Sequence, residues 1–276
     1  MRRKLYLVNE VGSTFYFDYV HSCIIEELDG FGFEFEIDYE DFNARFVETK
    51  RKIPQRTIDL TLVFIDRYNG FTRWREFLTK SKELRLFYET TAGKKYCYVN
   101  IKSSSKAQLE SGVLKSQVKI DCLSLWLVNK SAHIDVTDSG GGKVYAYEYP
   151  YVYAISFNGK VTVVNDSPRN VPLHIRLIGN CYNPRVIIRQ NGVDVQTLRL
   201  IVDERDQPTI EISSEPTNQY IRWHLGSEEA DYYNTQDFSC ENFLFLPPGE
   251  SEIFFDPGVR EEATCEISFR EEYIAH

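Results

Sequence analysis

His174 and Arg176 are separated by one residue in the segment PLHIRLIG, so an extended strand would place both side chains on one face. An imidazole and a guanidinium on one sheet face could hydrogen-bond the hydroxyl groups of a sugar. Trp223, in the segment YIRWHL, could supply an aromatic platform for such a ligand, although a tryptophan in the core is about three times as common. These three residues are candidates for carbohydrate binding, but a complete site needs several more converging polar groups that the sequence does not reveal.

Other residues that could do chemistry lack the partners that the chemistry requires. His21 and Cys23 are two positions apart, but no further ligand nearby completes a metal site. The carboxylates of residues 228–231 are expected to solvate a polar loop, and the glycines at 140–142 precede neither a helix nor the Lys-Ser/Thr pair of a phosphate loop. No GxSxG, HExxH or nucleotide-binding motif occurs. We therefore expect no catalytic residue, no metal and no cofactor, and a hydrolase with an unrecognised site is only the third-ranked hypothesis.

Composition indicates two domains with different surroundings. The chain has 276 residues, enough for two hydrophobic cores, and 14% of them are aromatic, which suits half-buried strands. Residues 1–130 hold 21 Lys and Arg against 18 Asp and Glu, whereas residues 131–276 hold 11 against 23. The acidic second half argues against binding of nucleic acid there, because affinity for phosphates depends on Lys and Arg.

The six cysteines form no metal-binding or redox motif, since no two lie within four residues of each other. They are Cys23, Cys97, Cys122, Cys181, Cys240 and Cys265. Most lie in apolar alternating segments, where a reduced thiol behaves as a small hydrophobic group. The N-terminal segment lacks the apolar run of a signal peptide, and no apolar run approaches the roughly 20 residues that span a bilayer. We therefore expect free thiols in a protein made in a reducing cytoplasm.

The first 130 residues predict an antiparallel sheet with one helix. Alternating apolar residues mark strands at 58–64, 84–88, 96–101 and 118–125. Between the first two strands, apolar residues that include Trp74 recur at three- and four-residue spacing, which predicts a helix near 71–80. Residues 31–38 alternate apolar with mostly acidic side chains, which favours a strand with one apolar and one charged face.

The second half predicts a β-sandwich. A break is expected after Leu127, because a polar stretch and the glycines at 140–142 follow it. Beyond it come short apolar strands with no helical periodicity, and Asn158-Gly159 and Asn191-Gly192 predict two-residue hairpin turns. The sequence therefore predicts a mainly β protein with domains at 1–130 and 131–276. Proteolysis is expected to nick the stretch 129–142 first.

Both halves resemble the distal tail proteins of long-tailed phages, the siphovirus tail component family. In the first half the likeness lies in an Arg-led strand at 56–64, a Trp- and Phe-bearing helix at 71–78, the segment LRLFYE and a strand that closes at Trp126. In the second half, NDSPRNVPLHIRLIGNCYNPRVII follows the family's pattern of turns and apolar residues. FLFLPPGESEIFF matches its Pro-Gly turn, with Ser251 where the family often has Asn. The resemblance implies an N-terminal, β-sandwich-like, ring-forming domain with one helix and a C-terminal galectin-like β-sandwich.

The same resemblance implies a structural function at the tail tip of a virion. Proteins of this family form a hexameric ring that joins the tail tube protein to the tail-associated lysin and carries receptor-binding proteins. DNA passes through the lumen without specific binding, and no membrane is involved. The chain resembles the short form of the family, without an inserted carbohydrate-binding module. The alternative is a carbohydrate-binding module that attaches to the host surface through His174, Arg176 and Trp223.

Overall fold

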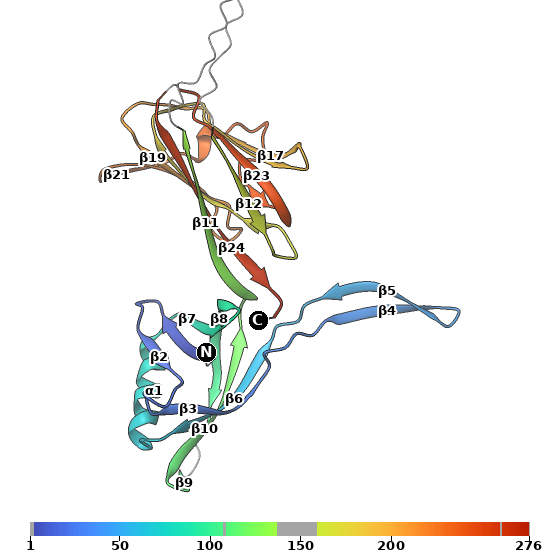
Figure 1. The fold of residues 1–276 in the computed structure, drawn as a ribbon, viewed down its shortest axis with the longest axis vertical. Helices are drawn as coiled ribbons and strands as arrows, with labels where there is room; N and C mark the ends of the chain where they lie inside the picture. The colour runs from blue at the N-terminus through green and yellow to red at the C-terminus, as the bar shows by residue number, and fades with distance from the viewer. Residues whose placement is uncertain (1–2, 107–108, 137–158, 260, 276) are drawn as a thin grey trace, which may run out of the picture. The chain divides into compact units, whose positions relative to one another are not determined.

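The computed structural model describes residues 3–106, 109–136, 159–259 and 261–275. The chain forms two compact units: residues 1–128 with 273–276 make up unit 1, and residues 129–272 make up unit 2. The described residues are mainly in strands, with one α-helix, as the sequence predicted (Figure 1). Within these ranges no helix combines the length and the apolar character needed to cross a membrane.

Unit 1 is built on antiparallel strands and one helix. Its elements are β1 (Lys4–Asn9), β2 (Thr14–Tyr16), β3 (Cys23–Asp29), β4 (Glu36–Phe42), β5 (Arg45–Lys52), β6 (Thr57–Phe64), α1 (Tyr68–Lys80), β7 (Leu84–Thr90), β8 (Gly93–Ser104), β9 (Leu109–Glu110), β10 (Val113–Cys122) and the start of β11 (Trp126–Val136). Seven strands pair in the order β2, β1, β7, β8, β10, β6 and β3. The predicted helix is therefore present and begins three residues earlier than expected, at Tyr68.

The core of unit 1 is aromatic where the helix meets the strands. Trp74 of α1 is 1% exposed, and its ring centroid lies 5.0 Å from that of Phe15. The indole Nε1 of Trp74 donates a hydrogen bond to Ser104 Oγ at 3.0 Å, which satisfies its only polar atom. The three- and four-residue spacing of the sequence thus identified the face of α1 that packs on the sheet.

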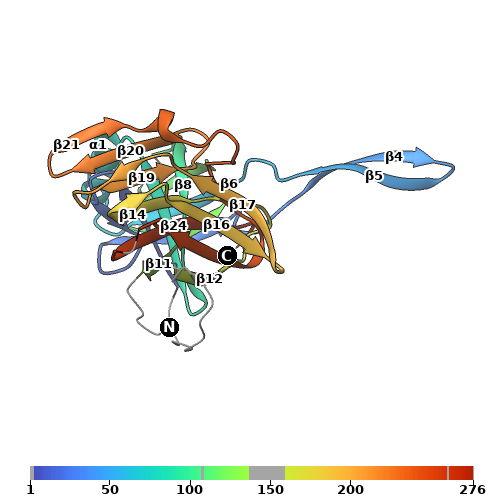
Figure 2. The same ribbon diagram turned by 90° about the horizontal axis from the view of Figure 1, so that it is seen from above.

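β4 and β5 form a two-stranded ribbon, here called the arm, that projects away from the other strands of unit 1 in both views (Figures 1 and 2). In the described part of the chain these two strands pair only with each other. The expected strand over 31–38 is wrong in its first half, because β4 begins only at Glu36. Phe31 instead packs into the unit 1 core, where its ring centroid lies 5.5 Å from that of Trp126. Phe31 therefore anchors the root of the arm.

Unit 2 consists of short strands in two layers. Besides the second part of β11, its elements are β12 (Gly159–Asn165), β13 (Val171–Pro172), β14 (His174–Gly179), β15 (Cys181–Tyr182), β16 (Arg185–Gln190), β17 (Val193–Arg199), β18 (Asp203–Glu204), β19 (Thr209–Ser213), β20 (Tyr220–Leu225), β21 (Glu228–Asp231), the 3-10 turn η1 (Tyr233–Thr235), β22 (Phe245–Leu246), β23 (Gly249–Asp256) and β24 (Ala263–Tyr273). One sheet has the order β11, β24, β14, β19, β20 and β21, and the other has β12, β23, β16 and β17. The predicted β-sandwich is consistent with this arrangement.

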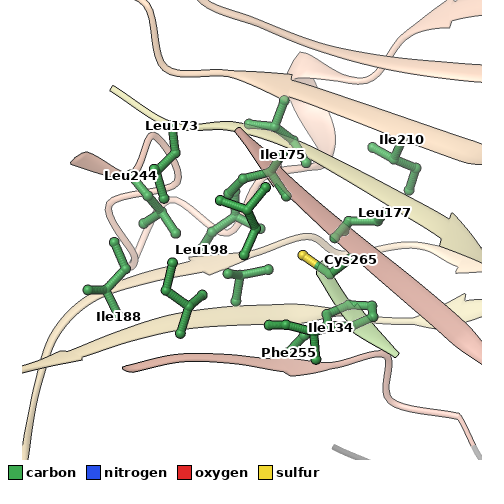
Figure 3. Close-up of a cluster of buried hydrophobic side chains, with 14 of the residues drawn as sticks. Ile134, Leu173, Ile175, Leu177, Ile188, Leu198, Ile210, Leu244, Phe255 and Cys265 are labelled. Atoms are coloured by element: carbon green, nitrogen blue, oxygen red, sulfur yellow. The ribbon is translucent and has the colours of Figure 1, made fainter. Parts of the chain in front are cut away.

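Aliphatic side chains from both sheets fill the space between them (Figure 3). On β14, Ile175 and Leu177 are buried, whereas the alternate residues are only partly covered. The same alternation buries Cys265 and Ile267 on β24. Apolar residues at alternate positions of these strands therefore face the core.

Two local expectations had different outcomes. The turn at Asn191-Gly192 is confirmed: it joins β16 to β17, and both residues have positive φ, 53° and 79°. The two compact units divide after Val128, next to the break expected after Leu127, but the chain there is not a loop, because β11 continues to Val136 with Ile134 and Val136 buried. Its polar residues occupy the exposed face of a strand and do not form a linker. Asn158 and the glycines at 140–142 lie outside the described residues.

Candidate functional site

The predicted pair His174 and Arg176 lies on the outer face of a unit 2 sheet. Both side chains are half-buried, so this face is not covered by the rest of the unit. His174 Nε2 lies 3.2 Å from the hydroxyl of Tyr220, which belongs to β20 two strands away. His174 and Tyr220 border a hollow of about 540 Å³ whose walls also include Ser213 and Ser268. A hollow with an aromatic ring and hydroxyl groups has the chemistry to hold a small polar ligand.

Arg176 is engaged within the sheet. Its Nε donates to Glu211 Oε1 at 3.1 Å, and its Nη1 donates to Glu266 Oε2 at 2.6 Å. Glu211 and Glu266 come from the strands on either side of β14, so the guanidinium bridges three neighbouring strands. Arg176 therefore neutralises two carboxylates of its own sheet, and a ligand would have to compete with both for its hydrogen bonds.

Trp223 is not brought together with His174 and Arg176. Its cross-strand partner is Ile210, which pairs with Leu177, so Trp223 occupies the core side of the sheet. The indole Nε1 donates to Glu204 Oε2 at 2.9 Å. The sequence suggested Trp223 as an aromatic platform, but its position in the register gives it the commoner structural role.

Tyr220 is the aromatic residue that the sequence analysis missed. It lies three positions before Trp223, and an odd separation along a strand places two residues on opposite faces. In the sequence, its position at the start of a predicted strand, two residues before Arg222, was only a weak signal. In the structure, the guanidinium carbon of Arg222 lies 4.3 Å from the Tyr220 ring centroid. Only the pairing of β14 with β19 and of β19 with β20 brings Tyr220 to His174.

The remaining candidates stay apart. His21 Nδ1 lies 2.7 Å from Asp18 Oδ1 at the surface, whereas Cys23 is buried in the unit 1 core, and its burial raises the pKa of the thiol to about 12. The described residues contain no group of three or more His, Cys, Asp and Glu side chains that could hold a metal ion. Residues 228–231 form strand β21 and not the polar loop that we expected, because the edge of β20 offers them backbone partners.

Unit 1 buries two neighbouring thiols beside a cation. Cys97 and Cys122 lie on the adjacent strands β8 and β10, and Arg56 Nε donates to Cys122 Sγ at 3.5 Å. The hydrogen bond from the Cys97 thiol, together with that from Arg56 and its charge, lowers the pKa of Cys122 to about 6, against the opposing effect of burial. The same thiol–thiol hydrogen bond and its own burial raise the pKa of Cys97. A Cys122 thiolate would offset the charge of Arg56 inside the unit.

The arm exposes large apolar side chains that a monomer leaves in water. Phe42 is 59% exposed and Phe46 is 73% exposed, and they lie on either side of the tip. An isolated two-stranded hairpin is marginally stable at best in water. Exposed aromatic rings on an unsupported ribbon are therefore typical of a surface that another molecule covers.

The chain is similar to proteins of phage tails. Residues 4–123 match the family model of the distal tail protein N-terminal domain. No curated protein sequence matches the chain. A chain of the phage P2 baseplate in its activated conformation with Ca is similar in structure over 100% of both chains, with a TM-score of 0.66 and 11% identity. The SPP1 Dit protein, described as a paradigm of the hub adsorption apparatus in phages that infect Gram-positive bacteria, is similar over 98% of this chain and 99% of its own, with a TM-score of 0.64 and 11% identity.

The two kinds of similarity support different statements. At 11% identity the likeness to the two phage proteins shows a shared fold. The family match covers unit 1 from the beginning of β1 to the end of β10, which includes the arm and α1. Residues 4–123 therefore carry the N-terminal domain of bacteriophage distal tail proteins, and the resemblance to these proteins read from the sequence is confirmed.

Proposed function

We propose that this chain is a structural subunit of the phage tail tip that closes into a hexameric ring. The observation that carries the proposal is the distal tail N-terminal domain at residues 4–123. The ring joins the tail tube protein to the tail-associated lysin and carries receptor-binding proteins, and DNA passes through its lumen without specific binding. In this proposal residues 1–130 form the ring, residues 131–276 form a galectin-like domain, and the chain has no enzymatic activity.

The arm supports a role in assembly. The arm exposes Phe42 and Phe46, which a neighbouring subunit would cover. A contact between two different surfaces of the same chain repeats from copy to copy and closes into a ring when the rotation per subunit allows it. The outer sheet face of unit 2, in contrast, already pairs Arg176 with Glu211 and Glu266.

Light scattering on a size-exclusion column tests the ring directly. We expect a particle of six times the 32.3 kDa of one chain. Negative-stain electron microscopy should then show rings with a central opening. A monodisperse monomer at high micromolar concentration, together with the absence of rings from purified virion tail tips, would contradict the proposal.

Carbohydrate binding is the second candidate, and the hollow beside His174 is the observation that favours it. Tyr220 would take the place of Trp223 as the aromatic residue, and His174 would donate or accept a hydrogen bond. We rank this function below assembly because Arg176 is held by two carboxylates. A glycan array tests it, with His174→Ala as the variant and His133→Ala, an exposed histidine on β11, as the matched control. Loss of host adsorption by His174→Ala alone, with the oligomeric state unchanged, would raise this candidate to first place.

A further inference from the structure

We infer that the arms of neighbouring copies pair with each other edge to edge, the acidic strand β4 of one copy lying against the basic strand β5 of the next. The inference rests on the ring proposed above and specifies the partner of the arm within it. Its starting point is the backbone. Since β4 and β5 pair only with each other in the described chain, each strand has one free edge of unpaired N–H and C=O groups.

The two strands carry opposite charges. The acidic residues of β4 are Glu36, Asp38, Glu40 and Asp41, and this strand has no basic residue. The basic residues of β5 are Arg45, Lys50, Arg51 and Lys52, with Glu48 as its only acidic residue. The ribbon therefore presents an acidic strand at one free edge and a basic strand at the other.

Part of this charge finds no partner inside the arm. Lys52 pairs with Glu36, and Arg51 Nη2 donates to Glu48 Oε2 at 2.7 Å. Across the strands, however, Glu40 lies opposite Val47 and Arg45 lies opposite Phe42. No ion pair to Glu40 or Arg45 occurs within the described residues. A second arm placed at either free edge would bring opposite charges to these side chains.

The sign of the charges selects the geometry of the contact. Two copies that paired β4 with β4 would oppose carboxylates, and two copies that paired β5 with β5 would oppose cations, both of which are unfavourable on adjacent strands. Pairing of β4 with β5 is the arrangement that matches charge. This contact joins different surfaces of the two copies, so it repeats from copy to copy instead of ending at a two-fold dimer. It closes into a ring when the rotation per subunit allows it. The same contact would bring the exposed rings at the two tips, Phe42 and Phe46, close to a neighbouring arm.

Two charge-reversed chains test the inference. In the first, Glu36, Asp38, Glu40 and Asp41 are replaced by Lys, so that both strands of the arm are basic. In the second, Arg45, Lys50, Arg51 and Lys52 are replaced by Glu, so that both strands are acidic. We expect each chain alone to need at least about a tenfold higher concentration than the wild type to assemble. An equimolar mixture should assemble again, because basic and acidic arms alternate around a ring with an even number of subunits.

Mixing the two chains does not change the pairing of β4 with β5 within either arm. Recovery of assembly in the mixture would therefore show that the arms of different copies contact each other. Replacing Glu261 and Glu262, exposed residues of unit 2, by Lys is the matched control and should leave assembly unchanged. If the wild-type chain stays monomeric, the ring itself fails. If the wild type forms rings and both reversed chains also form them at the wild-type concentration, the ring stands and the pairing of arms is overturned.

A cross-linking experiment decides the case in which the mixture fails to assemble. Glu40→Cys and Val47→Cys are introduced into separate chains, both with the half-buried Cys240 replaced by Ser. With a short bismaleimide we expect a cross-linked dimer when the two chains are mixed and little when either is alone. Assembled rings without that dimer would overturn the inference, whereas an equal yield from Glu40→Cys alone would show pairing of β4 with β4 and overturn it as well.

Discussion

The arm and the outer face of the unit 2 sheet are both β surfaces in contact with solvent, but they differ in how their charged side chains are paired. On the unit 2 face, Arg176 bridges Glu211 and Glu266 on the two neighbouring strands. In the arm, Glu40 and Arg45 lie opposite apolar residues, and aromatic rings remain exposed near the tip. The comparison indicates that the unit 2 face is complete in a single copy, whereas the arm needs a partner to satisfy its charges and cover its rings.

The two surfaces also differ in what supports them. The unit 2 face belongs to a sheet whose other side packs on a second sheet through residues such as Ile175 and Leu177. Among the described residues of unit 1, no second layer covers the arm, and its root is fixed where Phe31 packs beside Trp126. Substitutions at the root should therefore affect the arm far more than substitutions on the unit 2 face affect the sandwich.

Trp126→Ala should have the largest effect. The side chain is fully buried, and Phe31 and Arg56 both contact its ring, so its loss leaves a large cavity and frees the root of the arm. We expect unit 1 to lose about 3–5 kcal/mol of unfolding free energy. Chemical denaturation measures this loss, and hydrogen exchange should show faster exchange in β4 and β5. Phe33→Ala, at a position 62% exposed near the same root, is the control and should change stability by no more than about 0.5 kcal/mol. Equal effects of the two variants would show that the root of the arm is no more sensitive than an exposed position.

Gly30→Ala should have the next largest effect. Gly30 has φ +89°, and a Cβ atom there would lie 2.2 Å from the backbone oxygen of Thr57. Because the neighbour is backbone, we expect a loss of about 1–3 kcal/mol and a displaced arm. Gly32 provides a matched control two residues away, since a Cβ atom there would meet nothing within 4 Å. Gly32→Ala should be close to neutral, and thermal unfolding compares the two.

Cys122→Ser should change how the unfolding free energy of unit 1 depends on pH. At low pH it should change that free energy less. A thiol is an acid, and the folded pKa of Cys122, about 6, lies below the unfolded value of roughly 8.5. Its contribution is therefore fully present above about pH 8.5 and is lost as the pH falls through about 6. We expect the wild type to gain unfolding free energy relative to Cys122→Ser as the pH rises from 6 to 8.5. Parallel pH profiles would mean that Arg56 does not hold a thiolate.

Arg176→Gln, a substitution on the unit 2 face, should have the smallest effect. The side chains of Arg176 and Glu266 are 40% and 45% exposed, so solvent screens the ion pairs that the substitution removes. We expect a loss of about 0.5–1 kcal/mol and no change in assembly. Arg222→Gln is the control, since the ion pair of Arg222 with Glu229 is longer, at 3.6 Å. A loss of assembly with Arg176→Gln would place a subunit contact on the unit 2 face.

The sequence predicted most elements because their signals are local. The spacing around Trp74 predicted the helix, and Asn191-Gly192 predicted a hairpin turn whose two positive φ angles these residues tolerate. The segment 31–38 was misread because its alternation is as regular as that of a strand, although Phe31 leaves the pattern to enter the core. The polar residues after Leu127 belong to strand β11 and not to a loop, which the sequence did not show because an exposed strand face and a linker have similar composition.

By itself, the sequence determined that the chain is mainly β with one helix, and it carried enough of the family pattern to indicate a distal tail protein. These properties depend on the order of residues along the chain. Only the tertiary structure decided that His174 meets Tyr220 while Trp223 turns to the core, because strand register sets which residues share a face. The tertiary structure also decided that β4 and β5 stand apart from the sheet with opposite charges at their free edges. A list of acidic and basic residues cannot show this, since the charge of an edge depends on which strands remain unpaired.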